Sequence, residues 1–205
     1  MCLVRLKRVV IHGMDDIVKA ALAKWPNVPH CYGWLGLDAR GNWYMRDDRC
    51  QAAGPFARAE GDGGPASKGS LLKHEKLIDF IHRNYAADEQ GQWFFQNGPQ
   101  RVYVELENTP FIWRVQPDGR VWSHTGLDAG EVRQSLLDEQ GRLYLVTAMG
   151  LGLVHTSDMA QAADAVESGR WVPEPVQWSA LPIDGGFVRS PQRLHVRETQ
   201  SVSKP

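Results

Sequence analysis

The stretch that decides the fold is Gln92–Val115, which reads QWFFQNGPQRVYVELENTPFIWRV. Apolar and polar side chains alternate over Val102–Glu107 and again over Phe111–Val115, and a period of two is typical of half-buried strands. Asn108 and Thr109 separate the two runs and favour a turn. The pattern therefore predicts a hairpin with one apolar face. The cross-strand pairs on that face would be Leu106–Phe111, Val104–Trp113 and Val102–Val115.

Two further turns extend this hairpin. Asn97-Gly98-Pro99 joins it to an earlier strand, Trp93–Gln96, and Pro117-Asp118-Gly119 leads to a later one, Arg120–Ser123. A helix predicted over Leu71–Tyr85, with Ser70 as its N-cap, carries one apolar stripe and is expected to cover the apolar face. The expected fold class is therefore α+β, with an antiparallel β meander packed against one or two helices.

The 205 residues are enough for one sizeable core or two small ones. Residues 1–51 are expected to form a smaller N-terminal αβ lobe, with a strand at Leu3–His12 and a helix from Met14 to Trp25. Residues 52–70 are rich in Gly and Pro and are expected to be a loop or linker. Residues 71–189 form the main α+β lobe, and residues 190–205 have so little apolar content that we expect a disordered tail.

Three turn motifs recur at a spacing of 50 residues. They read Asp38-Ala39-Arg40-Gly41, Asp88-Glu89-Gln90-Gly91 and Asp138-Glu139-Gln140-Gly141. A fixed period of this size can indicate repeated structural units. The segments between the motifs do not match one another, so we interpret them as three turns of similar chemistry that open hairpins or strands.

Composition and charge exclude several classes of protein. With 23 Lys and Arg against 24 Asp and Glu, the net charge is −1, so no overall field attracts nucleic acid or an anionic membrane. Three cysteines are too few for a disulfide framework, and no apolar run is long enough to span a membrane. We expect no nucleic-acid or membrane partner and a cytoplasmic location.

The outer face of the predicted hairpin is the first candidate site. It would hold Tyr103, Glu105 and Arg114, with Trp93 as an aromatic wall, and could bind a small polar ligand or a peptide. The alternative is an ordinary solvent-facing sheet side with a surface ion pair. Because apolar side chains are mixed into this face, we also expect it to be covered by the N-terminal lobe or by a second copy of the chain in a homodimer.

His74 is the candidate for catalysis. It falls on the apolar stripe of the helix predicted over Leu71–Tyr85, so a buried, neutral imidazole is expected there. Such a histidine is more often a satisfied core residue than a base. If it is catalytic, the protein would be a small hydrolase or transferase that uses His74 with Glu105 or a cysteine. The cysteines and histidines do not show the spacing of a metal site, and no cofactor motif is present, so we expect neither metal nor cofactor.

Three segments resemble a family of uncharacterised proteobacterial proteins. They read LKRVVIHG, KWPNVPHCYGWLGLD and FFQNGPQRVYVELE, and the resemblance spans Met1–Val115. The resemblance implies a soluble bacterial protein and no particular activity. The sequence as a whole therefore favours a ligand-binding or protein-interaction module, with the hydrolase or transferase as the alternative.

Overall fold

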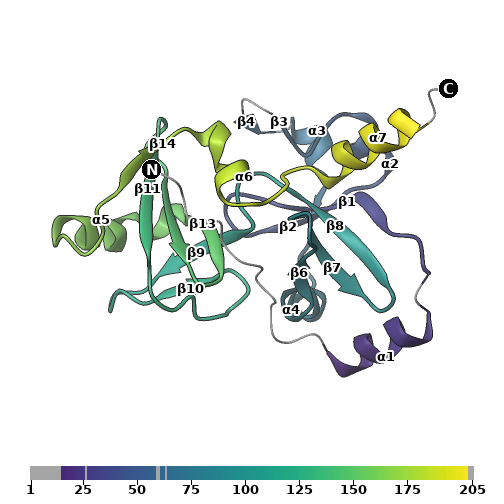
Figure 1. The fold of residues 1–205 in the computed structure, drawn as a ribbon, viewed down its shortest axis with the longest axis horizontal. Helices are drawn as coiled ribbons and strands as arrows, with labels where there is room; N and C mark the ends of the chain where they lie inside the picture. Colours follow the sequence, from purple (N-terminus) through teal and green to yellow (C-terminus); the bar gives the residue numbers. More distant parts are fainter. Residues whose placement is uncertain (1–14, 26, 59–60, 63, 203–205) are drawn as a thin grey trace. The chain divides into compact units, whose positions relative to one another are not determined.

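The computed structural model describes residues 15–25, 27–58, 61–62 and 64–202. The predicted strand Leu3–His12 lies outside the described residues. The contacts within the chain divide it into two units, which are described separately below (Figure 1). The first unit comprises residues 15–38, 42–107 and 188–202, and the second comprises residues 39–41 and 108–187. These boundaries do not follow the predicted lobes, because the chain leaves the first unit after Glu107 and returns to it at Val188.

The first unit is a six-stranded sheet with helices on both faces. The strand order is β5-β2-β1-β8-β7-β6, with β1 and β8 parallel and the other neighbours antiparallel. Its strands are β1 (Cys31–Leu37), β2 (Trp43–Met45), β5 (Ser70–Leu71), β6 (Tyr85–Ala87), β7 (Trp93–Asn97) and β8 (Gln100–Leu106), beside a small hairpin of β3 (Ala57–Arg58) and β4 (Gly61–Asp62). Its helices are α1 (Asp16–Lys24), α2 (Asp48–Ala52), α3 (Pro65–Lys68), α4 (Glu75–Arg83) and α7 (Pro191–Val202).

The predicted hairpin between Val102–Glu107 and Phe111–Val115 is wrong. Strand β8 pairs with β7 and with β1, and Val104 lies opposite Leu35 rather than Trp113. Asn108 and Thr109 are buried and begin the longer segment of the second unit, directly after Glu107. Each of the two predicted strands pairs with apolar strands of its own unit. The alternation therefore identified the strands but not their partners.

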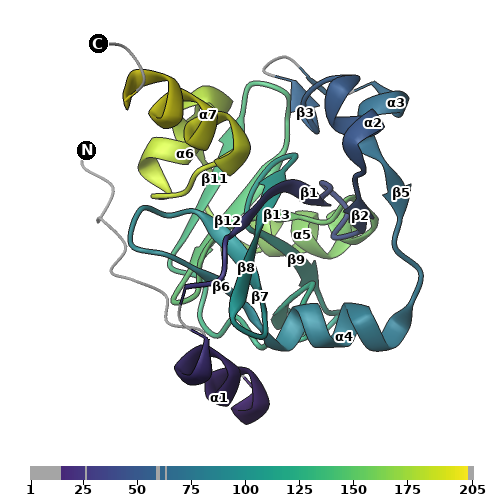
Figure 2. The same ribbon diagram turned by 90° about the vertical axis from the view of Figure 1, so that its right-hand side faces the viewer.

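Helices α4 and α7 cover opposite faces of the first sheet (Figure 2). On one face, Phe80 of α4 packs edge to face on Phe95, and Trp43 Nε1 donates a hydrogen bond to His82 Nε2 at 2.9 Å. On the other face, Tyr32 stacks against His195 of α7 with ring centroids 4.1 Å apart. The α+β fold class is confirmed. The meander beneath α4 is β6–β7–β8, which contains only two of the four predicted meander strands, because the predicted strands Phe111–Val115 and Arg120–Ser123 lie in the second unit.

Helix α7 replaces the predicted disordered tail. Residues 190–205 have few apolar side chains, but Pro191–Val202 is helical. The helix is held by the stacking of His195 on Tyr32 and by hydrogen bonds from Gln192 to Glu105 and Gln51. Ser190 precedes Pro191, and a Ser or Thr followed by Pro at the first helical position is a recognised helix start. That signal was present in the sequence and outweighed the low hydrophobicity.

The second unit is also a six-stranded sheet, in the order β10-β9-β13-β12-β11-β14. Its strands are β9 (Phe111–Val115), β10 (Val121–Ser123), β11 (Gln134–Asp138), β12 (Leu143–Thr147), β13 (Gly150–Val154) and β14 (Glu174–Val176). Its helices are α5 (Met159–Glu167) and α6 (Leu181–Asp184), with single turns η1 (Thr156–Asp158) and η2 (Trp178–Ala180).

The two sheets repeat one topology. In each, a hairpin is followed by a three-stranded antiparallel meander whose last strand pairs in parallel with the first strand of the hairpin. The order β2-β1-β8-β7-β6 therefore corresponds to β10-β9-β13-β12-β11. The 50-residue spacing from Asp88 to Asp138 joins equivalent turns, whereas the turn equivalent to that of Asp38 begins at Gln116.

The four turns that begin at Asp38, Asp88, Gln116 and Asp138 share one backbone geometry. The fourth residue of each turn is a glycine with φ between +74° and +82°, a conformation that side-chain-bearing residues avoid. The N–H of the first residue donates to the carbonyl four residues later. In three of the turns the first residue is an aspartate whose carboxylate also accepts from the backbone, so the recurring Asp-x-x-Gly motif is a hairpin signal.

Candidate functional site

The residues predicted to share one binding face do not meet. Tyr103 and Glu105 lie on the face of the first sheet that α7 covers, and Trp93 points to the opposite face because it precedes Phe94, the partner of Tyr103. Arg114 belongs to β9 in the second unit. The shared face on which that prediction rested does not exist, and a ligand role for any of the four stays a prediction.

Glu105 anchors the start of α7. Its side chain is buried, with the residue 2% exposed, and accepts hydrogen bonds from Ser190 Oγ at 2.5 Å and from the Gln192 N–H at 3.0 Å. Burial raises the pKa of Glu105 above its ordinary value, and the hydrogen bonds from Ser190 and Gln192 offset only part of that rise. The residue predicted to face solvent is therefore a buried link between β8 and α7.

Tyr103 is enclosed by other rings. It stacks on Tyr32 at 4.6 Å between ring centroids, and its hydroxyl donates to Asp88 Oδ2 at 3.1 Å. Trp93 packs against Tyr85 in the core of the first unit. These contacts give both aromatic residues a structural role.

Arg114 forms a bidentate ion pair with Asp158. Its Nε and Nη2 donate to the two carboxylate oxygens at 2.7 and 3.1 Å, and the Val115 N–H donates to Asp158 Oδ2 at 3.1 Å. Burial alone would raise the pKa of Asp158, but the hydrogen bonds from Arg114 and Val115 outweigh burial and lower that pKa below its ordinary value. The pair fixes the segment that leads from β13 into α5.

We expect Asp158→Ala to lower the free energy of unfolding by about 2 to 3 kcal/mol at pH 7, because it removes three charge-assisted hydrogen bonds. Since the folded-state pKa of Asp158 is lowered, its contribution is present above the unfolded pKa of about 3.9 and is lost as pH falls through the folded value. Urea unfolding across pH 3 to 7 measures this, with the exposed Asp164→Ala as control. An equal loss at every pH would contradict the assignment.

His74 is exposed and caps α4 rather than lying in the core. Its Nδ1 accepts the Leu77 N–H at 3.2 Å, and the helix begins at Glu75, after the predicted start. The histidine of this helix that packs on the sheet is His82, which is half-buried; burial lowers its pKa, and its Nε2 accepts from Trp43. Among the described residues, no hydrogen bond joins the His74 side chain to a carboxylate or a thiol, and catalysis by His74 stays a prediction.

A hollow of about 470 Å³ on the second unit is lined by charged side chains, none of which was predicted from the sequence as a site residue. Its walls are the β9–β10 turn, the loop before β11 and the residues just after α5. Val121 and Trp171, exposed by 2% and 5%, supply buried apolar lining. Small-molecule sites of about 300–1,000 Å³ with apolar walls and a few polar groups are common.

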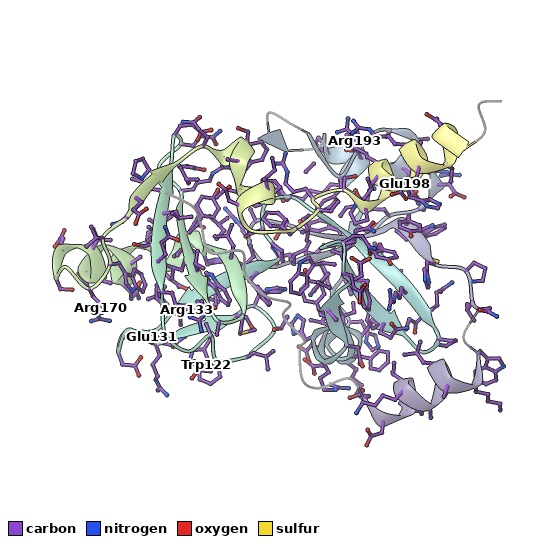
Figure 3. All side chains as sticks on the ribbon, viewed as in Figure 1. Trp122, Glu131, Arg133, Arg170, Arg193 and Glu198 are labelled. Atoms are coloured by element: carbon purple, nitrogen blue, oxygen red, sulfur yellow. The ribbon has the colours of Figure 1, made fainter. Side chains whose placement is uncertain are left out.

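Two arginines line this hollow. Arg170 is exposed, follows α5, and has no ion-pair partner among the described residues (Figure 3). Its guanidinium lies against Gly119, where an added Cβ would come 1.7 Å from Nη1, so the glycine makes room for it. Asp118 Oδ2 accepts from Arg120 Nε at 2.7 Å, which fixes that side chain and leaves its two Nη groups available. Two such guanidinium groups can bind an oxyanion.

Two carboxylates line the same hollow. Asp128 is committed to its own loop, because Oδ1 accepts the Gly130 N–H at 2.8 Å. Glu131 is exposed, and no described residue forms a hydrogen bond or ion pair with its side chain. The hollow therefore combines cationic, anionic and apolar groups from three segments. A second hollow, of about 480 Å³ along Trp122, shares Arg120 but lacks a second arginine.

In the sequence, a repeated Gly-Arg dipeptide marks two of the segments that line this hollow. Gly119-Arg120 and Gly169-Arg170 each precede a short apolar segment that contains a tryptophan, and both occur where an element ends. Side chains in loops on a rigid scaffold often carry function. Among the described residues, no group of three or more His, Cys, Asp or Glu side chains could hold a metal ion, and no helix is long and apolar enough to cross a membrane.

Comparison with known proteins identifies the family. A family model described as "Protein of unknown function (DUF2946)" matches residues 14–198. No curated protein matches the chain. Two crystal structures are similar, both of DUF1285 family proteins. The one from Silicibacter pomeroyi DSS-3 has 11% identity over 76% of this chain and 79% of that chain, with a TM-score of 0.44. The one from Shewanella baltica OS155 has 16% identity over 64% of this chain and 91% of that chain, with a TM-score of 0.41.

Proposed function

We propose a function from the geometry of the site alone, because the chain belongs to the family of proteins of unknown function (DUF2946). The protein acts as a binding module, and the hollow on its second unit takes a small ligand that carries an oxyanion group. The observation that carries this proposal is Arg170, a cation without an ion-pair partner among the described residues, beside the partly available guanidinium of Arg120.

Electrostatics and shape support the same ligand class. Arginine presents paired donors that match a carboxylate or phosphate, and Asp118 holds Arg120 in place before a ligand arrives. The buried side chains of Val121 and Trp171 offer apolar contact to the ligand's remaining atoms. Exposed charges interact weakly, so the affinity should be modest and should fall as salt is added.

We expect Arg170→Gln to weaken the binding of pentanoate by at least about fivefold, because one of two guanidinium partners is lost. Isothermal titration with pentanoate and, separately, inorganic phosphate measures this on the full chain. Arg133→Gln is the matched control, because Arg133 is an exposed arginine of the same unit that does not line the hollow (Figure 3). Binding of neither anion, or equal binding by Arg170→Gln and the wild type, would refute the proposal.

A cytoplasmic bacterial location and the lack of a nucleic-acid partner are also proposed. The support is the net charge of −1 and the three cysteines. Homodimerisation was inferred from apolar groups on the outer face of the predicted hairpin. Within this chain Tyr32 covers Tyr103, and Ile112 is buried, so these apolar groups no longer support a homodimer. Light scattering is the measurement that decides the oligomeric state.

A further inference from the structure

We propose that the ligand of this hollow is a zwitterion of the amino-acid class, with a carboxylate held by Arg170 and Arg120 and an ammonium group held by Glu131. This inference rests on the proposed function and names the ligand class for the same hollow. It follows from the two signs of charge that the hollow combines with its buried apolar lining.

Glu131 is the carboxylate available to a ligand. Asp128 accepts the Gly130 N–H and so shapes the loop, whereas Glu131 has no hydrogen-bond or ion-pair partner among the described residues and lines the hollow from the same loop. An anion alone would gain nothing from Glu131 and would be repelled by it. A ligand with an added ammonium group turns that repulsion into attraction.

The charged groups come from different segments, and a short apolar stem would join the two charged ends of such a ligand. The arginines come from the β9–β10 turn and the end of α5, and Glu131 comes from the loop before β11. Buried Val121 and Trp171 complete the lining, so methylene groups that bridge the two charged ends would meet apolar atoms. An ω-amino acid has this arrangement of carboxylate, methylene stem and ammonium group.

A matched series of probes tests the inference. Butanoate, pentanoate and hexanoate are compared by titration with 4-aminobutanoate, 5-aminopentanoate and 6-aminohexanoate. At the best chain length, we expect the amino compound to bind about three- to fivefold more tightly, since an exposed ion pair adds only modest affinity. In Glu131→Gln this advantage should disappear while binding of the simple carboxylate is kept or improved.

The controls separate this inference from the proposed function. Glu167→Gln removes an exposed carboxylate of α5 that does not line the hollow and should keep the advantage of the amino compounds. If simple carboxylates bind in an Arg170-dependent manner but the amino group adds nothing at any length, or its advantage survives in Glu131→Gln, the zwitterion inference is overturned and the anion site stands. If no carboxylate binds, the zwitterion inference falls, and if inorganic phosphate does not bind either, the proposed function falls with it.

Discussion

Trp113→Ala is expected to lower the free energy of unfolding by about 3 to 5 kcal/mol, the range for removing a large aromatic side chain from a core. Trp113 is fully buried in the second unit, where it stacks on Phe111 at 5.0 Å and donates from Nε1 to the Leu145 carbonyl at 2.9 Å. The truncation leaves a cavity and an unsatisfied carbonyl, and both effects are destabilising.

The packing around Trp113 leaves little room for compensation. A Cβ added at Gly152, on the neighbouring strand β13, would come 2.4 Å from Trp113 Nε1, so the indole fills the space that a side chain would take. Chemical denaturation followed by circular dichroism measures the loss. Hydrogen exchange then shows whether β9 and β13 lose protection together. Trp122→Ala, at a half-buried position of β10, is the control, and an equal loss there would contradict this account of the core.

Arg46→Met is expected to cost about 3 to 5 kcal/mol, because it takes the donors away from several buried or partly buried carbonyls. Arg46 is 1% exposed and donates to three backbone carbonyls, those of Ser67, Gly33 and Gly54, at 2.6 to 3.0 Å. Burial lowers the pKa of Arg46, and the nearby charge of Glu105 opposes that shift. Methionine fills similar space but leaves those carbonyls without donors.

The replacement should loosen one segment more than the rest of the first unit. The acceptors of Arg46 come from β1, from the residues after α2 and from α3, so the guanidinium ties the two ends of the segment between Gly54 and Ser67 to the sheet. Limited proteolysis should therefore cut Arg46→Met within this segment first. Arg49→Met, on the exposed side of α2, should stay within about 0.5 kcal/mol of the wild type. Arg46→Lys should recover only part of the loss, since a lysine lacks the planar fork.

The sequence identified strands β7 to β10 and helices α1 and α4 because each has a local signature. The alternation in Val102–Glu107 and Phe111–Val115 correctly marked β8 and β9, and the Asp-x-x-Gly motifs correctly marked turns. Pairing is a separate question, because any strand with one apolar face satisfies that face equally well against several partners. Thr109 does not close a hairpin. Its hydroxyl donates to the Phe111 carbonyl and accepts the Leu153 N–H, both in the second unit.

The candidate site could not be predicted because its residues meet only through the fold. Glu105 read as solvent-facing by alternation, yet its partners Ser190 and Gln192 lie 85 and 87 residues away in the sequence. Arg120, Glu131 and Arg170 come from three separate connections of the second unit. Each one alone has the local pattern of an ordinary exposed charge, and nothing short of the tertiary arrangement distinguishes it.

A titration of ¹⁵N-labelled protein with 5-aminopentanoate, followed through backbone amide chemical shifts, tests the binding site most directly. The account predicts saturable shifts concentrated at residues 119–121, 128–132 and 170–171, and their loss in Arg170→Gln. Shifts concentrated on the first unit, around Tyr32 and α7, or no saturable shifts at all, would contradict it.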